Sequence, residues 1–214
     1  MTNKRKVFTL SFLTVFFWAS AFPITKIAQE QFSSNTLGFL RCSLAAFFLL
    51  IIGKCMHIKK PKQKDIPWFF LSGGLGFTIY LLAFNTGIQT ITSATSSVVM
   101  SITPILTAIL GTKLYNETIR PFGWLSIFTA FIGVLILLLW DGIFSINIGL
   151  LWTLLASIVF CGYNILSRKL SQKKYSPLEI VTYSMLCGAI LLFFFSFGSI
   201  GELKGADTKH IFSL

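Results

Sequence analysis

Apolar runs of about twenty residues recur along this chain and constrain its fold more than any other feature. A run of that length is what an α-helix needs to cross the hydrocarbon core of a bilayer, roughly 30 Å thick. Only 12% of the 214 residues are charged, whereas soluble domains have about a quarter charged residues. The sequence therefore predicts an all-α fold, a polytopic transmembrane helix bundle. Its hydrophobicity and aromatic content exclude an intrinsically disordered chain.

Hydropathy windows of about 19 residues predict seven membrane spans. Their ranges are 7–26, 35–53, 66–87, 93–112, 121–140, 148–167 and 177–197. Strands of a membrane β-barrel would instead alternate apolar and polar residues over about ten positions, which is not the pattern here. The basic start and Ala19-Ser20-Ala21 imitate a cleavable signal peptide. The regular polar stripe in this run favours a retained span, because a signal peptide does not need one.

Most basic residues lie in the loops on one side of the predicted membrane. These are Lys4, Arg5, Lys6, Lys54, Lys59, Lys60, Lys62, Lys64, Lys113, Arg120, Arg168, Lys169, Lys173 and Lys174, whereas Lys26, Lys204 and Lys209 lie on the other side. The positive-inside rule then predicts a multi-pass protein of the cell (inner) membrane with its N-terminus in the cytoplasm. The net charge of +11 does not predict nucleic-acid binding, because no basic stripe is interleaved with aromatic residues.

No residue pattern predicts an enzyme, a cofactor or a metal centre. The four cysteines have no C-x-x-C spacing, and the two histidines, His57 and His210, fall in polar connections. Apart from Glu179 at the very start of the range 177–197, no Asp or Glu lies within a predicted span, so the sequence does not support proton coupling or cation selectivity. The stretch Gly73-Gly74-Leu75-Gly76 indicates a helix-packing notch, because no Lys-Ser/Thr pair follows to complete a phosphate loop.

Polar residues recur at helical period in four of the predicted spans. In the range 93–112, one half of the helix carries Ser93, Ser96, Ser97, Ser101, Thr103, Pro104 and Thr107, and the other carries Val98, Val99, Ile102, Ile105, Leu106 and Ile109. The other stripes are Ser11, Thr14, Trp18, Ala21 and Thr25; Gly74, Thr78 and Asn85; and Thr153, Ser157, Asn164 and Ser167. We expect these stripes to face the bundle and the valine-rich side to face lipid.

Two interpretations of the stripes remain open, helix packing and a polar substrate path. Small residues and hydroxyls pack helices closely, but Trp18, Asn85 and Asn164 are too large or too polar for that role alone. The candidate path residues are Thr14, Trp18, Arg41, Thr78, Asn85, Ser93, Ser97, Ser101, Thr103, Ser157 and Asn164. Arg41 is a charge well inside a span, so it either reaches the surface, pairs with Glu30 or helix-end carbonyls, or attracts an anionic substrate group.

An offset of 143 residues aligns the first two spans with the last two, placing Phe17 on Phe160, Lys26 on Lys169 and Gln29 on Gln172. Five spans per copy is an odd number, so the second copy enters the membrane inverted, as in secondary transporters. At this point the sequence resembles the EamA-type transporters of the drug/metabolite transporter superfamily. The residues that carry the resemblance are Trp18 to Phe22, Leu40-Arg41, Thr92 to Ser97, Thr103-Pro104, Asn116-Glu117 and Gly133-Val134.

The resemblance implies a ten-span transporter of two inverted halves (5+5) that moves amino acids, other small metabolites or drugs, often outward, by alternating access. Residues 7–140 then form a first EamA-like repeat, and residues 148–214 begin a second, inverted one. The chain departs from this pattern by stopping at Leu214, where Ile211–Leu214 resemble the first residues of an eighth span. The expected partners are the lipid bilayer and a small-molecule substrate, and a homodimer would cover a polar face left without its counterpart.

Two alternative functions stay open at this stage. A non-transporting truncated remnant or a membrane assembly subunit agrees with the incomplete second repeat. A seven-helix receptor or retinal protein agrees with the span count. However, such proteins have their N-terminus outside the cell, opposite to the orientation predicted for this chain, and the range 177–197 contains no lysine for a retinal Schiff base.

Overall fold

The structure is a computed structural model that describes residues 2–30, 32–116, 118–140 and 147–197, and all regular elements in these ranges are helical. The elements are α1 (Thr2–Ala28), α2 (Ser34–Cys55), the 3-10 turn η1 (Gln63–Asp65), α3 (Ile66–Gly73), the π-helical segment η2 (Gly74–Ile79), α4 (Tyr80–Thr90), α5 (Ser93–Met100), α6 (Ile102–Tyr115), α7 (Pro121–Trp140), α8 (Ile148–Gln172) and α9 (Pro177–Ser196).

Six helical stretches of the described chain are long and apolar enough to cross a membrane, and α7 occupies the one remaining predicted range, 121–140. The prediction of a polytopic transmembrane helix bundle is thereby confirmed. Ile211–Leu214, which the sequence predicts to begin an eighth span, lie outside the described residues, as do His210, Lys204, Lys209 and Glu117.

Two of the predicted spans are interrupted rather than continuous. The first consists of α3, the π-helical η2 and α4, and the second bends at Ser101 between α5 and α6. Pro104 explains the bend, because it has no N–H to bond to the carbonyl of Met100 and its ring clashes with that carbonyl. Gly73, Gly74 and Gly76 weaken the helix at the other interruption.

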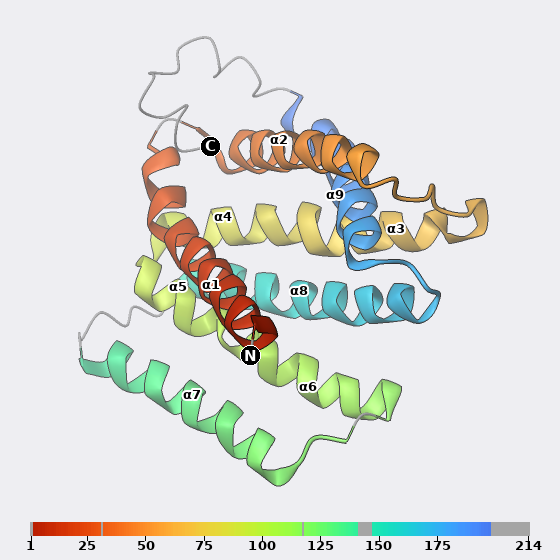
Figure 1. Ribbon diagram of the computed structural model, residues 1–214. Helices are drawn as coiled ribbons and strands as arrows, with labels where there is room; N and C mark the ends of the chain where they lie inside the picture. Colours follow the sequence, from red (N-terminus) through yellow and green to blue (C-terminus); the bar gives the residue numbers. More distant parts are fainter. Residues whose placement is uncertain (1, 31, 117, 141–146, 198–214) are drawn as a thin grey trace.

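The most extensive helix packing in the described bundle is between α2 and α9 and between α4 and α8. Figure 1 shows α3 and α4 lying alongside α8, while α9 crosses both α2 and α3. The crossing of α9 with α3 is very close, since a Cβ built on Gly73 would lie 2.4 Å from the carbonyl oxygen of Ser184 and 2.7 Å from the amide nitrogen of Gly188. Glycine at position 73 thus allows the two backbones to touch, as is common where membrane helices pack.

The contact between α2 and α9 includes residues that are equivalent in the predicted repeat. The Cys42 thiol donates to the carbonyl oxygen of Met185 (3.4 Å), and these positions are 143 residues apart. Equivalent residues meet each other where a two-fold axis passes between two copies of a unit. The contact at 42 and 185 is therefore what an axis between inverted repeats would produce.

Helix α1 differs from the prediction, because most of its polar stripe is not covered by the described chain. Ser11, Thr14, Trp18 and Ala21 are exposed, and only Thr25 is buried. The helix meets the bundle at α4 and α5 and crosses it diagonally (Figure 1). A diagonal helix buries mainly the part at the crossing, and periodicity predicts which face is polar but not how much of that face is covered.

The predicted lipid side of α5 is wrong for Val98 and Val99, which are 7% and 6% exposed. The bend at Ser101 shifts the phase of the helix, so one helical wheel drawn through residues 93–112 does not describe both α5 and α6. In addition, α5 contacts α8, α7 and α1 and is covered on more than one side. Pro104, assigned to the polar half, is exposed.

Candidate functional site

The predicted path residues of α5 and α6 are satisfied mainly within their own helices. The hydroxyls of Ser97 and Ser101 each donate to a carbonyl three residues earlier, at 2.8 Å and 2.6 Å. Ser93 is half-buried. Thr103 is 5% exposed, and its hydroxyl has no hydrogen-bond partner among the described residues. Of these four side chains, Thr103 has a buried polar atom that a ligand could still satisfy.

The two predicted path residues of α1 are both exposed. The Thr14 hydroxyl donates to the carbonyl of Leu10 at 2.8 Å, within its own helix. Trp18 is 62% exposed, but its ring lies 5.8 Å from that of Phe160 on α8. The Phe160 ring is also 4.8 Å from the ring of Tyr80. Trp18 therefore connects α1 to an aromatic cluster on α4 and α8.

Thr78 and Asn85 are buried and tie neighbouring helices together. The Thr78 hydroxyl, 3% exposed, donates to the carbonyl of Gly188 on α9 at 3.2 Å. The Asn85 amide, 1% exposed, donates to the carbonyl of Ser34 at the start of α2 at 3.0 Å. Both side chains make the interhelical bonds that a packing role requires.

Ser157 and Asn164 join α8 to the helices that follow α4. The fully buried Ser157 hydroxyl lies 3.2 Å from the carbonyl oxygen of Val99 and 3.1 Å from that of Thr153. The Asn164 amide donates to the Thr107 hydroxyl at 3.4 Å. These contacts explain why the polar sides of the predicted spans 93–112 and 148–167 face one another.

Arg41 belongs to a cluster that we call the polar junction, made of Thr25, Gln29, Ser34, Arg41 and Asn85, where α1, α2 and α4 meet. Arg41 Nη1 donates to Thr25 Oγ1 at 2.5 Å. Gln29 Nε2 donates to the backbone carbonyl of Asn85, also at 2.5 Å. The junction lies near the ends of α1 and α4, on the side opposite the lysine-rich loops.

A polar pocket of about 330 Å³ opens next to the polar junction. Lys26, Ile27, Gln29, Glu30 and Gln89 line it. The side-chain oxygen of Gln29 is buried and has no hydrogen-bond partner among the described residues. Burial of an amide oxygen without a partner is costly. The pocket therefore presents charges of both signs, and the buried Gln29 oxygen is an unused acceptor in its wall.

The sequence interpretation missed Gln29 and selected Arg41 and Asn85, which the structure brings to the same junction. Thr14, Trp18 and the α5 serines are not part of it. Gln29 gave no signal in the sequence, because it follows the apolar run and resembles an ordinary loop residue. Gln29 lies one residue beyond the end of α1 and four residues after Thr25, and this spacing is the pattern that could have identified it.

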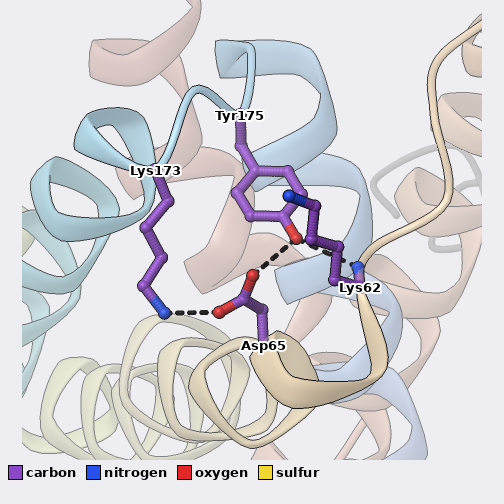
Figure 2. A network of polar contacts seen from close by, with 4 residues as sticks. All are labelled: Lys62, Asp65, Lys173 and Tyr175. Atoms are coloured by element: carbon purple, nitrogen blue, oxygen red, sulfur yellow. Dashed lines mark hydrogen bonds and ion pairs between the residues drawn. The ribbon is translucent and has the colours of Figure 1, made fainter.

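A second polar network, which we call the clasp, joins the start of α3 to the connection between α8 and α9 (Figure 2). The Asp65 carboxylate is 2% exposed; it pairs with the Lys173 ammonium and accepts a hydrogen bond from Tyr175 Oη at 2.9 Å. Tyr175 Oη accepts from the Lys62 N–H at 3.0 Å. Burial and the bond to Asp65 raise the pKa of the Tyr175 phenol above its ordinary value.

The clasp fixes the lysine-rich ends of α3 and α8 relative to α9. Asp65 and Lys173 are 108 positions apart in the sequence, so no local sequence motif predicts that they pair. Within the ranges that the structure covers, no group of three or more His, Cys, Asp or Glu side chains is arranged to hold a metal ion.

Apolar helices joined by buried hydroxyls, amides and small residues define a multi-pass membrane protein. The sequence profile of the EamA-like transporter family matches residues 5–139 and 147–214. The chain belongs to this family. Its members and the relatives below are transporters, which points to a function other than catalysis.

Three relatives named as transporters or exporters are similar over most of this chain. The uncharacterized transporter YdfC of Bacillus subtilis is 29% identical over 203 residues, covering 94% of this chain and 66% of that protein. An uncharacterized transporter of Archaeoglobus fulgidus is 32% identical over 196 residues, covering 90% and 68%. A protein of Streptantibioticus cattleyicolor named "Probable terminal-alkyne amino-acid exporter" is 26% identical, covering 84% and 60%. The chain thus spans about two thirds of the length of these relatives, or less.

A solved crystal structure has a similar fold, with a TM-score of 0.62 and 17% sequence identity. The similarity covers 85% of this chain and 66% of the other. At this identity the likeness concerns the fold alone.

Proposed function

We propose that this chain takes part in moving small polar metabolites, amino acids among them, outward across the cell membrane, with its N-terminus in the cytoplasm. Transport would follow a polar path between two inverted repeats by alternating access. The family and the transporter relatives support the general activity. The name of one relative, an amino-acid exporter, supports the substrate class.

The observation that carries the proposal is the position of Arg41. Its guanidinium lies within the bundle and bonds to Thr25, one helical turn from Gln29, which lines the polar pocket. A charge inside a membrane span is costly and is usually found where function requires it. Arginine also suits carboxylate recognition, because its planar donors match the two carboxylate oxygens.

The two ends of an amino acid have different partners at this junction. The carboxylate is attracted to the Arg41 guanidinium, while the ammonium group donates to the buried side-chain oxygen of Gln29. Thr103 on α6 has another buried side-chain oxygen without a partner among the described residues. Four further predicted path residues support the fold of the bundle rather than the ligand directly, because Asn85, Thr78, Ser157 and Asn164 bond to neighbouring helices.

A ligand-dependent thermal shift on the purified chain tests the substrate class. Each of the common amino acids is added at millimolar concentration, and stabilisation follows mass action, about 2.7 kcal/mol at a hundred times Kd. We expect a subset of amino acids to raise the melting temperature of the wild type and to have no effect on Arg41→Gln. Arg120→Gln is the matched control, because Arg120 is an exposed loop arginine.

Flux in proteoliposomes then tests transport with the same ligands. Uptake that saturates in the wild type and in Arg120→Gln, but not in Arg41→Gln, supports the proposed role of Arg41. If no amino acid distinguishes the wild type from Arg41→Gln in either assay, Arg41 has a packing role and the proposed substrate class is wrong.

A further inference from the structure

An apolar groove runs along the outer side of α2 and α9, away from the polar junction. Its volume is about 390 Å³, within the range of about 300–1,000 Å³ that is typical of ligand pockets. Ala46 and Ala189 form its floor and are 3% and 8% exposed. Phe47 and Phe193 on its walls are 59% and 40% exposed. In a membrane protein, such an exposed apolar face borders the acyl chains of the bilayer.

The groove lies across the place where the predicted repeat puts its internal two-fold axis. Its lining contains pairs of residues 143 positions apart, namely Ala46 and Ala189, Phe47 and Ile190, and Leu50 and Phe193. The hydrogen bond between Cys42 and Met185 lies on the same axis. The apolar shape of the groove is thus nearly the same toward both of its ends.

Charge breaks this symmetry at one end of the groove. Ser43, Phe47, Leu50 and Lys54 follow one another at intervals of four, three and four residues, so they share one face of α2. Lys54 is exposed and lies about 6 Å beyond Leu50 along the helix axis. The equivalent position is Phe197, directly after α9, which is exposed and apolar. A cation is therefore present at the lysine-rich end of this stripe and replaced by a phenyl ring at the other.

We propose that this groove binds one acyl chain of an anionic phospholipid, whose phosphate contacts the Lys54 ammonium. The groove contacts the acyl chain of the lipid. Lys54 favours lipids with a negatively charged headgroup in the leaflet on the lysine-rich side. Each lysine near a membrane surface favours an anionic lipid by about five-fold. The exposed Lys59 and Lys60, which follow α2 in the sequence, add to the same positive field. This lipid site does not depend on the proposed transport function.

Native mass spectrometry of the detergent-purified chain tests the site. Phosphatidylglycerol and phosphatidylcholine with identical acyl chains are added at equal concentration, and the lipid retained by the wild type, Lys54→Gln and Ser43→Phe is counted. Lys113→Gln is the matched control, because Lys113 is an exposed lysine at the end of α6, away from the groove.

We expect the wild type and Lys113→Gln to retain phosphatidylglycerol at least five-fold over phosphatidylcholine. Lys54→Gln should lose most of this preference, and Ser43→Phe, which fills the groove, should retain less of both lipids. Equal retention of the two lipids by the wild type would overturn the proposal. An equal loss of lipid preference in Lys54→Gln and Lys113→Gln would also overturn the proposal. The same holds if the wild type is observed as a dimer without bound lipid. If Ser43→Phe does not fold, the comparison of the two lysine variants still decides, because both positions are exposed.

Discussion

Replacing Gly73 by alanine tests whether backbone contact between α3 and α9 holds the bundle together. The added Cβ would lie 2.4 Å from the carbonyl oxygen of Ser184, 2.7 Å from the amide nitrogen of Gly188 and 3.0 Å from the Cβ of Cys187. The two shortest contacts are to backbone atoms, which no side-chain rotation can move. One helix must therefore shift away from the other.

The expected size of this effect follows from two opposing terms. Overpacking costs about 1–3 kcal/mol, and a clash with backbone belongs in the upper half of that range. Alanine is favoured over glycine within a helix by about 0.8–1.0 kcal/mol. Since Gly73 already has helical dihedral angles, φ −65° and ψ −42°, the alanine variant is stabilised by this difference in helix preference. We expect Gly73→Ala to lower the free energy of unfolding by about 1–2 kcal/mol.

The neighbouring residue provides a matched control. Gly74 has almost the same dihedral angles, φ −59° and ψ −49°, but a Cβ there would meet only a Leu191 methyl at 3.6 Å. Gly74→Ala should leave the free energy of unfolding unchanged or raise it by up to about 1 kcal/mol. The assay is denaturant unfolding of both variants in mixed micelles. Equal stability of the two variants would show that the contact between α3 and α9 is looser than the structure has it.

Three further outcomes can be checked on the same purified chain or in cells. Cys55 is exposed and adjoins the lysine-rich loop, so a membrane-impermeant thiol reagent should label it in inverted vesicles; labelling in intact cells would reverse the proposed orientation. Asn85→Leu should cost about 0.6–2 kcal/mol of stability, because it removes a buried interhelical hydrogen bond to Ser34; an unchanged unfolding curve would contradict this. Asp65→Ala should lower the melting temperature more than Lys173→Gln, because the carboxylate has two partners and the lysine is partly exposed; an unchanged melting temperature in Asp65→Ala would show that the clasp does not stabilise the fold.

The sequence predicted the helices well, because a bilayer imposes one strong requirement. Every backbone N–H and C=O inside the hydrocarbon must be bonded within its own segment, so length and hydropathy suffice to locate a span. Each predicted range coincides with helical structure. The two interruptions were harder to predict, although Pro104 and the glycines from 73 to 76 were visible, because such residues are tolerated inside membrane helices.

The site was only partly predictable. Arg41 and Asn85 stood out, because charges and amides are rare inside spans. The partners of these side chains depend on which helices cross and at what angle, and neither is encoded in the periodicity of one helix. Val98 and Val99 illustrate the difference: their sequence pattern indicates a lipid side, yet α5 is covered by several neighbours.

The sequence by itself thus determined the class of protein and the ranges of its apolar helical segments. Only the tertiary structure decided that Gly73 lies against Ser184, that Asp65 pairs with Lys173, and that Arg41 bonds to Thr25. The physical reason is the range of the interactions. Insertion into a bilayer depends on the local composition of a segment, whereas packing depends on shape complementarity between segments far apart in the chain.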